Sequence, residues 1–177
     1  MKFNTKQIAI VGLLGAITMV LGSTSLGFIP IPFSPAGRAT IMHIPVILAA
    51  ILEGPIVGMM VGLIFGLFSF FQQASPLFAD PLIAILPRVL IGLMSYLAFR
   101  PFALAHKQAA GSVVAAIVGT LTNTIGVLGL ALWRGLLPNW QTAGLVVVTH
   151  GFPEVLVAGI LVYFVYQGIL RYLEKRK

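Results

Sequence analysis

Four polar side chains lie within otherwise apolar stretches of the sequence, and they are the first candidates for chemistry. Arg88 and Asn123 each lie within a long apolar run, whereas His150 and Glu154 are four residues apart on either side of Pro153. A planar guanidinium suits a carboxylate or phosphate group. A residue pair spaced by four shares one face of a helix. These residue types indicate binding of a small polar ligand or transfer of protons.

The composition places these side chains in a membrane. Hydrophobic residues make up 59% of the 177 residues, charged residues only 8%, and the net charge is +7. Soluble domains carry about 25% charged residues, so a soluble globule, a disordered chain and a fibrous repeat are excluded. A membrane-spanning helix needs about 20 residues. The chain is therefore expected to be an integral membrane protein with about six spans.

The pattern of apolar runs and breakers predicts an all-α fold, a bundle of six transmembrane helices forming a single domain over 1–177. A long, apolar outside loop, 22–41, joins the first two helices and contains Pro30, Pro32 and Pro35. Long loops are usually functional or disordered, and the apolar content favours a packed one. The predicted helices span about 6–22, 41–53, 55–71, 81–99, 110–132 and 143–170.

The distribution of basic residues predicts the orientation. The termini and the 100–109 turn together carry eight Lys and Arg residues, whereas the other side carries Arg38 and Arg134. By the positive-inside rule both termini lie in the cytoplasm, as in a multi-pass protein of a bacterial cell membrane. No basic face is left for nucleic acid, so the lipid bilayer is the expected surrounding and no nucleic-acid partner is expected.

Helix geometry predicts that the polar side chains share one depth. With a rise of 1.5 Å per residue, Arg88 and His150 lie roughly 10 Å below the outer helix ends, Asn123 roughly 14 Å and Glu154 roughly 17 Å. Three helices thus contribute to one polar band in the outer half of the membrane. This band predicts a pocket open to the outside that the 22–41 loop is able to cover. Phe28 in that loop and Trp133 beyond the fifth helix are further candidate binding residues.

Each polar residue also has a structural alternative. Arg88 could form an ion pair with Glu154 or extend toward the interface, because intramembrane charges usually pair. Asn123 could bond between helices. His150 could satisfy backbone groups freed by Pro153, or relay protons with Glu154. The last possibility gives the competing hypothesis of a self-sufficient proton-coupled transporter that uses His150 and Glu154.

Enzymatic function is not expected. The sequence contains no cysteine and no GxSxG, HExxH or GxxxxGK[ST] motif, which removes the usual nucleophile, zinc and nucleotide signatures. Two intramembrane acids at most cannot hold a hard cation without many further oxygen ligands. We therefore expect no catalytic residue, no cofactor and no bound metal.

The ordered set of motifs resembles the substrate-binding S components of energy-coupling factor (ECF) vitamin transporters. The resemblance covers essentially the whole chain and extends over six short helices and the long first outside loop. The matching stretches are His43-Ile44-Pro45 through Glu53-Gly54-Pro55, Gly58, Gly62 and Gly66, Pro87-Arg88-Val89-Leu90-Ile91-Gly92, and Gly119-Thr120-Leu121-Thr122-Asn123-Thr124.

The resemblance implies a vitamin-binding subunit of an ABC-type importer. Such a subunit binds a vitamin from outside and works with a membrane coupling subunit and two cytoplasmic ATPases. The sequence looks most like pantothenate carriers, while pyridoxine, folate and riboflavin carriers share parts of the pattern. The family's docking motif in the first helix is Ala-x-x-x-Ala. Here Gly12-x-x-x-Ala16 departs from it at the first position, and we expect Gly12 and Ala16 to contact the coupling subunit.

Overall fold

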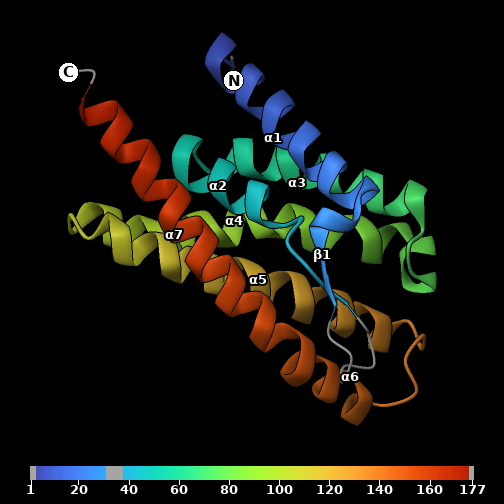
Figure 1. The fold of residues 1–177 in the computed structure, drawn as a ribbon. Helices are drawn as coiled ribbons and strands as arrows, with labels where there is room; N and C mark the ends of the chain where they lie inside the picture. The colour runs from blue at the N-terminus through green and yellow to red at the C-terminus, as the bar shows by residue number, and fades with distance from the viewer. Residues whose placement is uncertain (1–2, 31–37, 176–177) are drawn as a thin grey trace.

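The computed structural model describes residues 3–30 and 38–175, so part of the predicted 22–41 loop lies outside the described residues. The described chain is almost entirely helical, with one two-stranded antiparallel sheet. Figure 1 shows the arrangement. The elements are α1 (Thr5–Ser23), η1 (Ser25–Gly27), β1 (Phe28–Pro30), β2 (Arg38–Thr40), α2 (Ile44–Glu53), α3 (Pro55–Gln72), η2 (Pro76–Ala79), α4 (Pro81–Leu104), α5 (Gln108–Trp133), α6 (Trp140–Val146), η3 (Val147–Gly151) and α7 (Phe152–Glu174).

Five helical segments of the described chain are long and apolar enough to cross a membrane. The last is the longest, because α6, the π-helical η3 and α7 run on as 35 residues from Trp140 to Glu174. The second predicted span, 41–53, differs from the rest, since the corresponding helix α2 has only 10 residues. At 1.5 Å per residue it covers about 15 Å, half of the ~30 Å hydrocarbon core. The count of six full spans is therefore not matched by the helix lengths.

The short helix α2 forms the centre of the bundle. Eight consecutive residues from Ile44 to Ile51 are buried, and α2 packs on α1, α3, α4, α5 and α7. A helix that is apolar all round must be enclosed by other helices or by lipid, and here other helices enclose it. Gly54, with φ of 98°, ends α2 and turns the chain into α3, a conformation that favours glycine.

Close packing of α3 against α4 depends on small residues. A Cβ added at Gly62 would collide with the backbone of Arg88, and one added at Gly92 would collide with the backbone of Gly58. The glycines of α3 at 58, 62 and 66 therefore lie against α4, as small residues at helix contacts in membranes allow. This contact fixes the backbone that carries Arg88.

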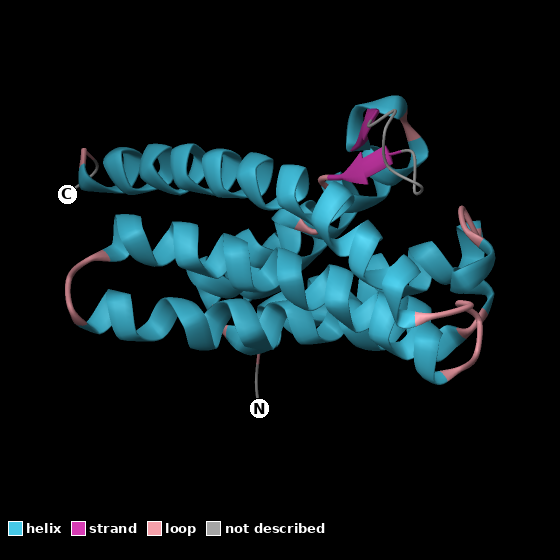
Figure 2. Ribbon diagram, turned by 90° about the horizontal axis from the view of Figure 1, so that it is seen from below, coloured by secondary structure: helices cyan, strands magenta, loops and turns pink. Residues whose placement is uncertain are grey.

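The two ends of the bundle differ in character. Figure 1 shows the turn between α4 and α5 and the C-terminal end of α7 at one end, with the β1–β2 hairpin and α6 toward the other. Figure 2 shows the two strands at the edge of the helical bundle. A salt bridge from Lys6 to Glu53 joins the start of α1 to the α2–α3 turn. The described parts of the predicted 22–41 loop, η1, β1 and β2, lie at the hairpin end of the bundle, and residues 31–37 of that loop lie outside the described residues.

Candidate binding site

A cavity of about 720 Å³ lies at the hairpin end of the bundle. Its size falls in the range of about 300–1,000 Å³ that is usual for small-molecule sites. The lining comes from α1, the β1–β2 hairpin, α3, η2, α4, α5 and α7. Five of the six residues predicted to bind substrate line it: Phe28, Arg88, Asn123, His150 and Glu154.

Trp133 lies apart from this group. Its side chain is 71% exposed at the end of α5, and it is absent from the cavity lining. Its ring lies 5.8 Å from the guanidinium of Arg134. The structure therefore does not bring Trp133 together with the other five, and its position agrees better with the aromatic belt found at membrane interfaces.

The orientation of Arg88 follows from the proline before it. Pro87 has no N–H to donate to the carbonyl of Ile83 one turn earlier, so that acceptor is free within α4. The Arg88 guanidinium donates to this Ile83 oxygen at 2.8 Å. Its carbon atom lies 4.4 Å from the ring centroid of Phe78 and 5.3 Å from that of Phe65, within the range of cation–π attraction. The backbone and two aromatic rings thus hold a cation in the cavity wall.

The alternative of an ion pair between Arg88 and Glu154 is not formed in the structure. Among the described residues Arg88 contacts no carboxylate, although only 3% of the residue is exposed. Its Nε atom is buried without a hydrogen-bond partner. A buried, unpaired guanidinium is costly unless something else neutralises it. The geometry leaves Arg88 free to bind an anion.

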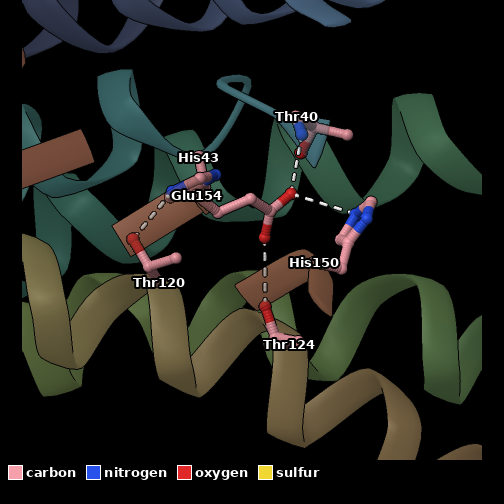
Figure 3. A network of polar contacts seen from close by, with 6 residues as sticks. All are labelled: Thr40, His43, Thr120, Thr124, His150 and Glu154. Atoms are coloured by element: carbon pink, nitrogen blue, oxygen red, sulfur yellow. Dashed lines mark hydrogen bonds and ion pairs between the residues drawn. The ribbon is translucent and has the colours of Figure 1, made fainter. Parts of the chain in front are cut away.

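Glu154 is held by groups from three other elements, as Figure 3 shows. Its Oε1 accepts from the backbone N–H of Thr40 at 2.6 Å and lies 3.4 Å from Nε2 of His150. Its Oε2 accepts from the Thr124 hydroxyl at 3.2 Å. This carboxylate therefore ties α7 to the hairpin and to α5 while it lines the cavity.

The other two predicted polar residues, Asn123 and His150, each have a buried polar atom without a partner. Asn123 is 8% exposed and its Oδ1 is buried without a partner, so the predicted interhelical bond through this oxygen is not formed. His150 is 9% exposed, and its Nδ1 is likewise unpaired. The ring of His150 contacts Glu154 and not the backbone freed by Pro153. Unpaired buried polar atoms are rare, and a bound ligand would satisfy these.

The π-helical segment explains how His150 reaches the cavity. Pro153 cannot donate a backbone hydrogen bond, and the helix widens over Val147–Gly151 just before it. Such single-turn π segments occur often at functional sites. The wider turn places His150 and Glu154 on the side of the helix that faces the hairpin and α5. The sequence indicates the proline but not the wider turn.

Sequence reasoning missed several contributors to the site. Thr40 acts through its backbone, which no side-chain pattern reveals. Thr124 lies in the polar stretch that contains Asn123, so it could have been found there. Phe65 and Phe78 are aromatic residues in apolar surroundings and carry no signal of their own. His43 is fully buried and contacts the Thr120 hydroxyl at 2.9 Å, and it does not line the cavity.

Comparison with known proteins identifies the family. Residues 6–166 match the family described as ECF transporter, substrate-specific component. The chain belongs to this family of S components. It is consequently a multi-pass membrane protein of a transporter family and not an enzyme.

Individual relatives agree with the family. The pantothenic acid transporter PanT of Lactococcus lactis subsp. cremoris (strain MG1363) is 29% identical over 187 residues, covering 90% of this chain and 91% of that protein. Among solved structures, ThiT from Listeria monocytogenes matches with a TM-score of 0.67 at 21% identity, covering 93% of this chain and 96% of that one. A bacterial ECF transporter S component matches with a TM-score of 0.61 at 25% identity, covering 96% of each chain. The ThiT match concerns the fold alone.

Gly12 and Ala16 of α1, which we expect to contact a coupling subunit, are accessible. Only 17% of the residues in the most apolar stretch of α1 are buried within the described bundle. Ala16 is exposed, and a Cβ added at Gly12 would meet no atom within 4 Å. Within the described chain, Gly12 and Ala16 therefore lie on a face without a neighbour.

Proposed function

We propose that this S component captures pantothenate from outside the cell and delivers it inward. The observation that carries the proposal is the buried Arg88 guanidinium, which lines the cavity without a carboxylate partner. Pantothenate has one carboxylate to match it, and hydroxyl and amide groups to match Asn123 and His150. The 29% identity to a pantothenic acid transporter supports the same ligand. Pyridoxine and riboflavin have no such carboxylate, and folate has two.

The partners follow from the family. We propose that the chain works with a membrane coupling subunit and two cytoplasmic ATPases. The ATPases would hydrolyse ATP to drive transport, because this chain has no nucleotide-binding motif of its own. The unpartnered face of α1 at Gly12 and Ala16 is the proposed contact with the coupling subunit. Both termini then lie in the cytoplasm and the cavity opens outward.

The ligand is tested by mass spectrometry of small molecules that remain bound through purification, followed by titration of the ligand-free protein with a vitamin panel. We expect pantothenate to co-purify, and to bind more tightly than riboflavin, pyridoxine, folate or thiamine. Tight binding of a different vitamin, with no measurable binding of pantothenate, would reject this assignment while keeping the family.

One observation favours a second candidate, a proton-coupled transporter that works alone. His150 and Glu154 contact each other at 3.4 Å inside the helical bundle, and intramembrane pairs of this kind are used as proton relays. Proteoliposomes that contain the chain alone, with a proton gradient imposed, separate the two candidates. Uptake there without ATPase partners would favour the second candidate, whereas uptake that requires the coupling subunit, the ATPases and ATP favours the first.

A further inference from the structure

The cavity has opposite charges on different walls. Among the described residues that line it, Arg88 of α4 and Glu154 of α7 carry the full charges, and they do not pair with each other. His150 is the remaining titratable group of the described lining, and it lies beside Glu154. The site therefore has a cationic end and an acidic end.

The unpaired polar atoms of Arg88 and Asn123 require different groups on the ligand. At the cationic end the free Nε of Arg88 is a donor, so it needs an acceptor. The free Oδ1 of Asn123, which also lines the cavity, is an acceptor, so it needs a donor. Glu154 accepts three contacts, whereas an ionised carboxylate offers about four acceptor positions. One position on Glu154 thus remains for a ligand donor.

We infer that Glu154 is a specificity-determining residue that admits ligands with a single anionic group and rejects those with a second one. This inference rests on the proposed function and names the ligand class more narrowly. The single anion binds at Arg88, and hydroxyl or N–H groups bind at the Glu154 end. A second anion on that part of the ligand would face a buried carboxylate, and repulsion between charges is strong where water is scarce.

Glu154 is suited to this role because neighbouring groups fix its position. The Thr40 N–H and the Thr124 hydroxyl both point at its oxygens, and such donors favour the charged form of a carboxylate. The side chain cannot turn away from a ligand without giving up contacts to two other elements. Only 3% of it is exposed, so solvent screens it weakly.

The experiment compares three ligands that differ at one hydroxyl group. Pantothenate has its distal hydroxyl free, one derivative carries a phosphate ester there, and a second carries an uncharged acetyl ester there. Dissociation constants are measured for the wild-type chain in detergent. We expect the phosphate ester to bind at least tenfold more weakly than the acetyl ester, because bulk alone affects both.

The variant Glu154→Gln removes the charge and keeps the shape and an acceptor oxygen for Thr40. We expect it to reduce the ratio between the two ester dissociation constants at least fivefold. Glu53→Gln is the matched control, because Glu53 pairs with Lys6 and does not line the cavity. We expect this control to leave the ratio at the wild-type value.

Each result is decisive for one claim. Equal dissociation constants of the two esters for the wild type, whether both bind weakly or both bind tightly, would overturn the role of Glu154. This comparison uses the wild type alone, so it does not depend on the folding of the variant. An unchanged ester ratio in a folded Glu154→Gln protein would overturn it too. Failure of pantothenate itself to bind the wild type would instead reject the proposed function.

Discussion

At the scale of single residues, the arrangement around Arg88 depends on a missing hydrogen bond. Pro87 frees the carbonyl of Ile83, and the Arg88 side chain donates to it. A lysine can supply charge but not the fork of several donors that reaches a backbone oxygen and an anion together. The geometry of the guanidinium is therefore as important as its charge.

The substitution Arg88→Lys tests this point. We expect it to weaken pantothenate binding at least tenfold, because lysine cannot replace a planar bidentate donor. The measurement is titration of the purified variant, with its melting temperature as the check on folding. A lysine variant that binds as tightly as the wild type would show that charge alone is sufficient.

A double substitution distinguishes ligand binding by Arg88 from an ion pair. We expect Arg88→Ala to lose ligand binding. Because Arg88 and Glu154 do not pair, we expect the double variant Arg88→Ala/Glu154→Ala neither to regain binding nor to melt at a higher temperature than Arg88→Ala. The measurement is binding and thermal unfolding of both proteins. Recovery of folding in the double variant would favour the ion pair.

An ion pair outside the membrane-spanning segments gives a pH prediction. The Arg134 side chain bonds to Asp80 at 2.6 Å and lowers the pKa of that carboxyl. A lowered pKa in the folded state means that the stability gained is present above the ordinary pKa of about 3.9 and is lost as the pH falls through the folded value. Asp80 also caps α4 through the N–H of Leu82, and asparagine caps equally well.

Asp80→Asn therefore removes the charge and keeps the cap. We expect this variant to melt at a slightly lower temperature than the wild type at pH 7, and at the same temperature once the pH is below the lowered pKa. The effect is small because exposed ion pairs contribute little. A difference that is constant across pH would show that the charge of Asp80 is not the cause.

At the scale of elements, packing of α3 on α4 decides where Arg88 lies. We expect Gly62→Ala to destabilise the protein by roughly 1–3 kcal/mol, as overpacking usually does, because its Cβ would collide with the Arg88 backbone. Gly129→Ala on α5 is the matched control, since a Cβ there meets no atom within 4 Å. Thermal unfolding in detergent measures both, and equal melting temperatures would contradict the close contact.

The exposed face of α1 is tested in the same way. We expect Gly12→Leu to leave pantothenate binding intact and to reduce recovery of the complex with the coupling subunit, because leucine fills the groove that close helix contact needs. Gly168→Leu on α7 is the control, another exposed helical glycine with no atom near its added Cβ. Equal recovery of both variants would place the contact elsewhere.

At the scale of the whole molecule, the sequence predicts the class of fold better than its details. The low content of charged residues and the long apolar runs predict a membrane-spanning helical bundle. The predicted depths of Arg88, Asn123, His150 and Glu154 place them at one level, and all four line one cavity. The predicted end of the second helix at residue 53 agrees with α2, but its enclosure by other helices could not be predicted, because an apolar helix is buried equally well by protein or by lipid. The hairpin contact of Glu154 with the Thr40 backbone could not be predicted, because any residue offers that N–H group.

Orientation in the membrane is also a property of the whole molecule. The chain contains no cysteine, so a single introduced cysteine is the sole thiol to react. We expect a cysteine at Asn139 to react with an impermeant reagent added outside intact cells. We expect one at Ala105 to react only after the membrane is opened, by the positive-inside rule. The opposite pattern would reverse the predicted topology.

The central claim is that Arg88 binds the single anion of a pantothenate-like ligand in the outward cavity. The most direct measurement is calorimetric titration of pantothenate into the ligand-free wild-type chain and into Arg88→Gln. We predict saturable binding of one pantothenate per chain by the wild type and at least a hundredfold weaker binding by a folded Arg88→Gln protein. Equal affinity of the two proteins for pantothenate would contradict the account.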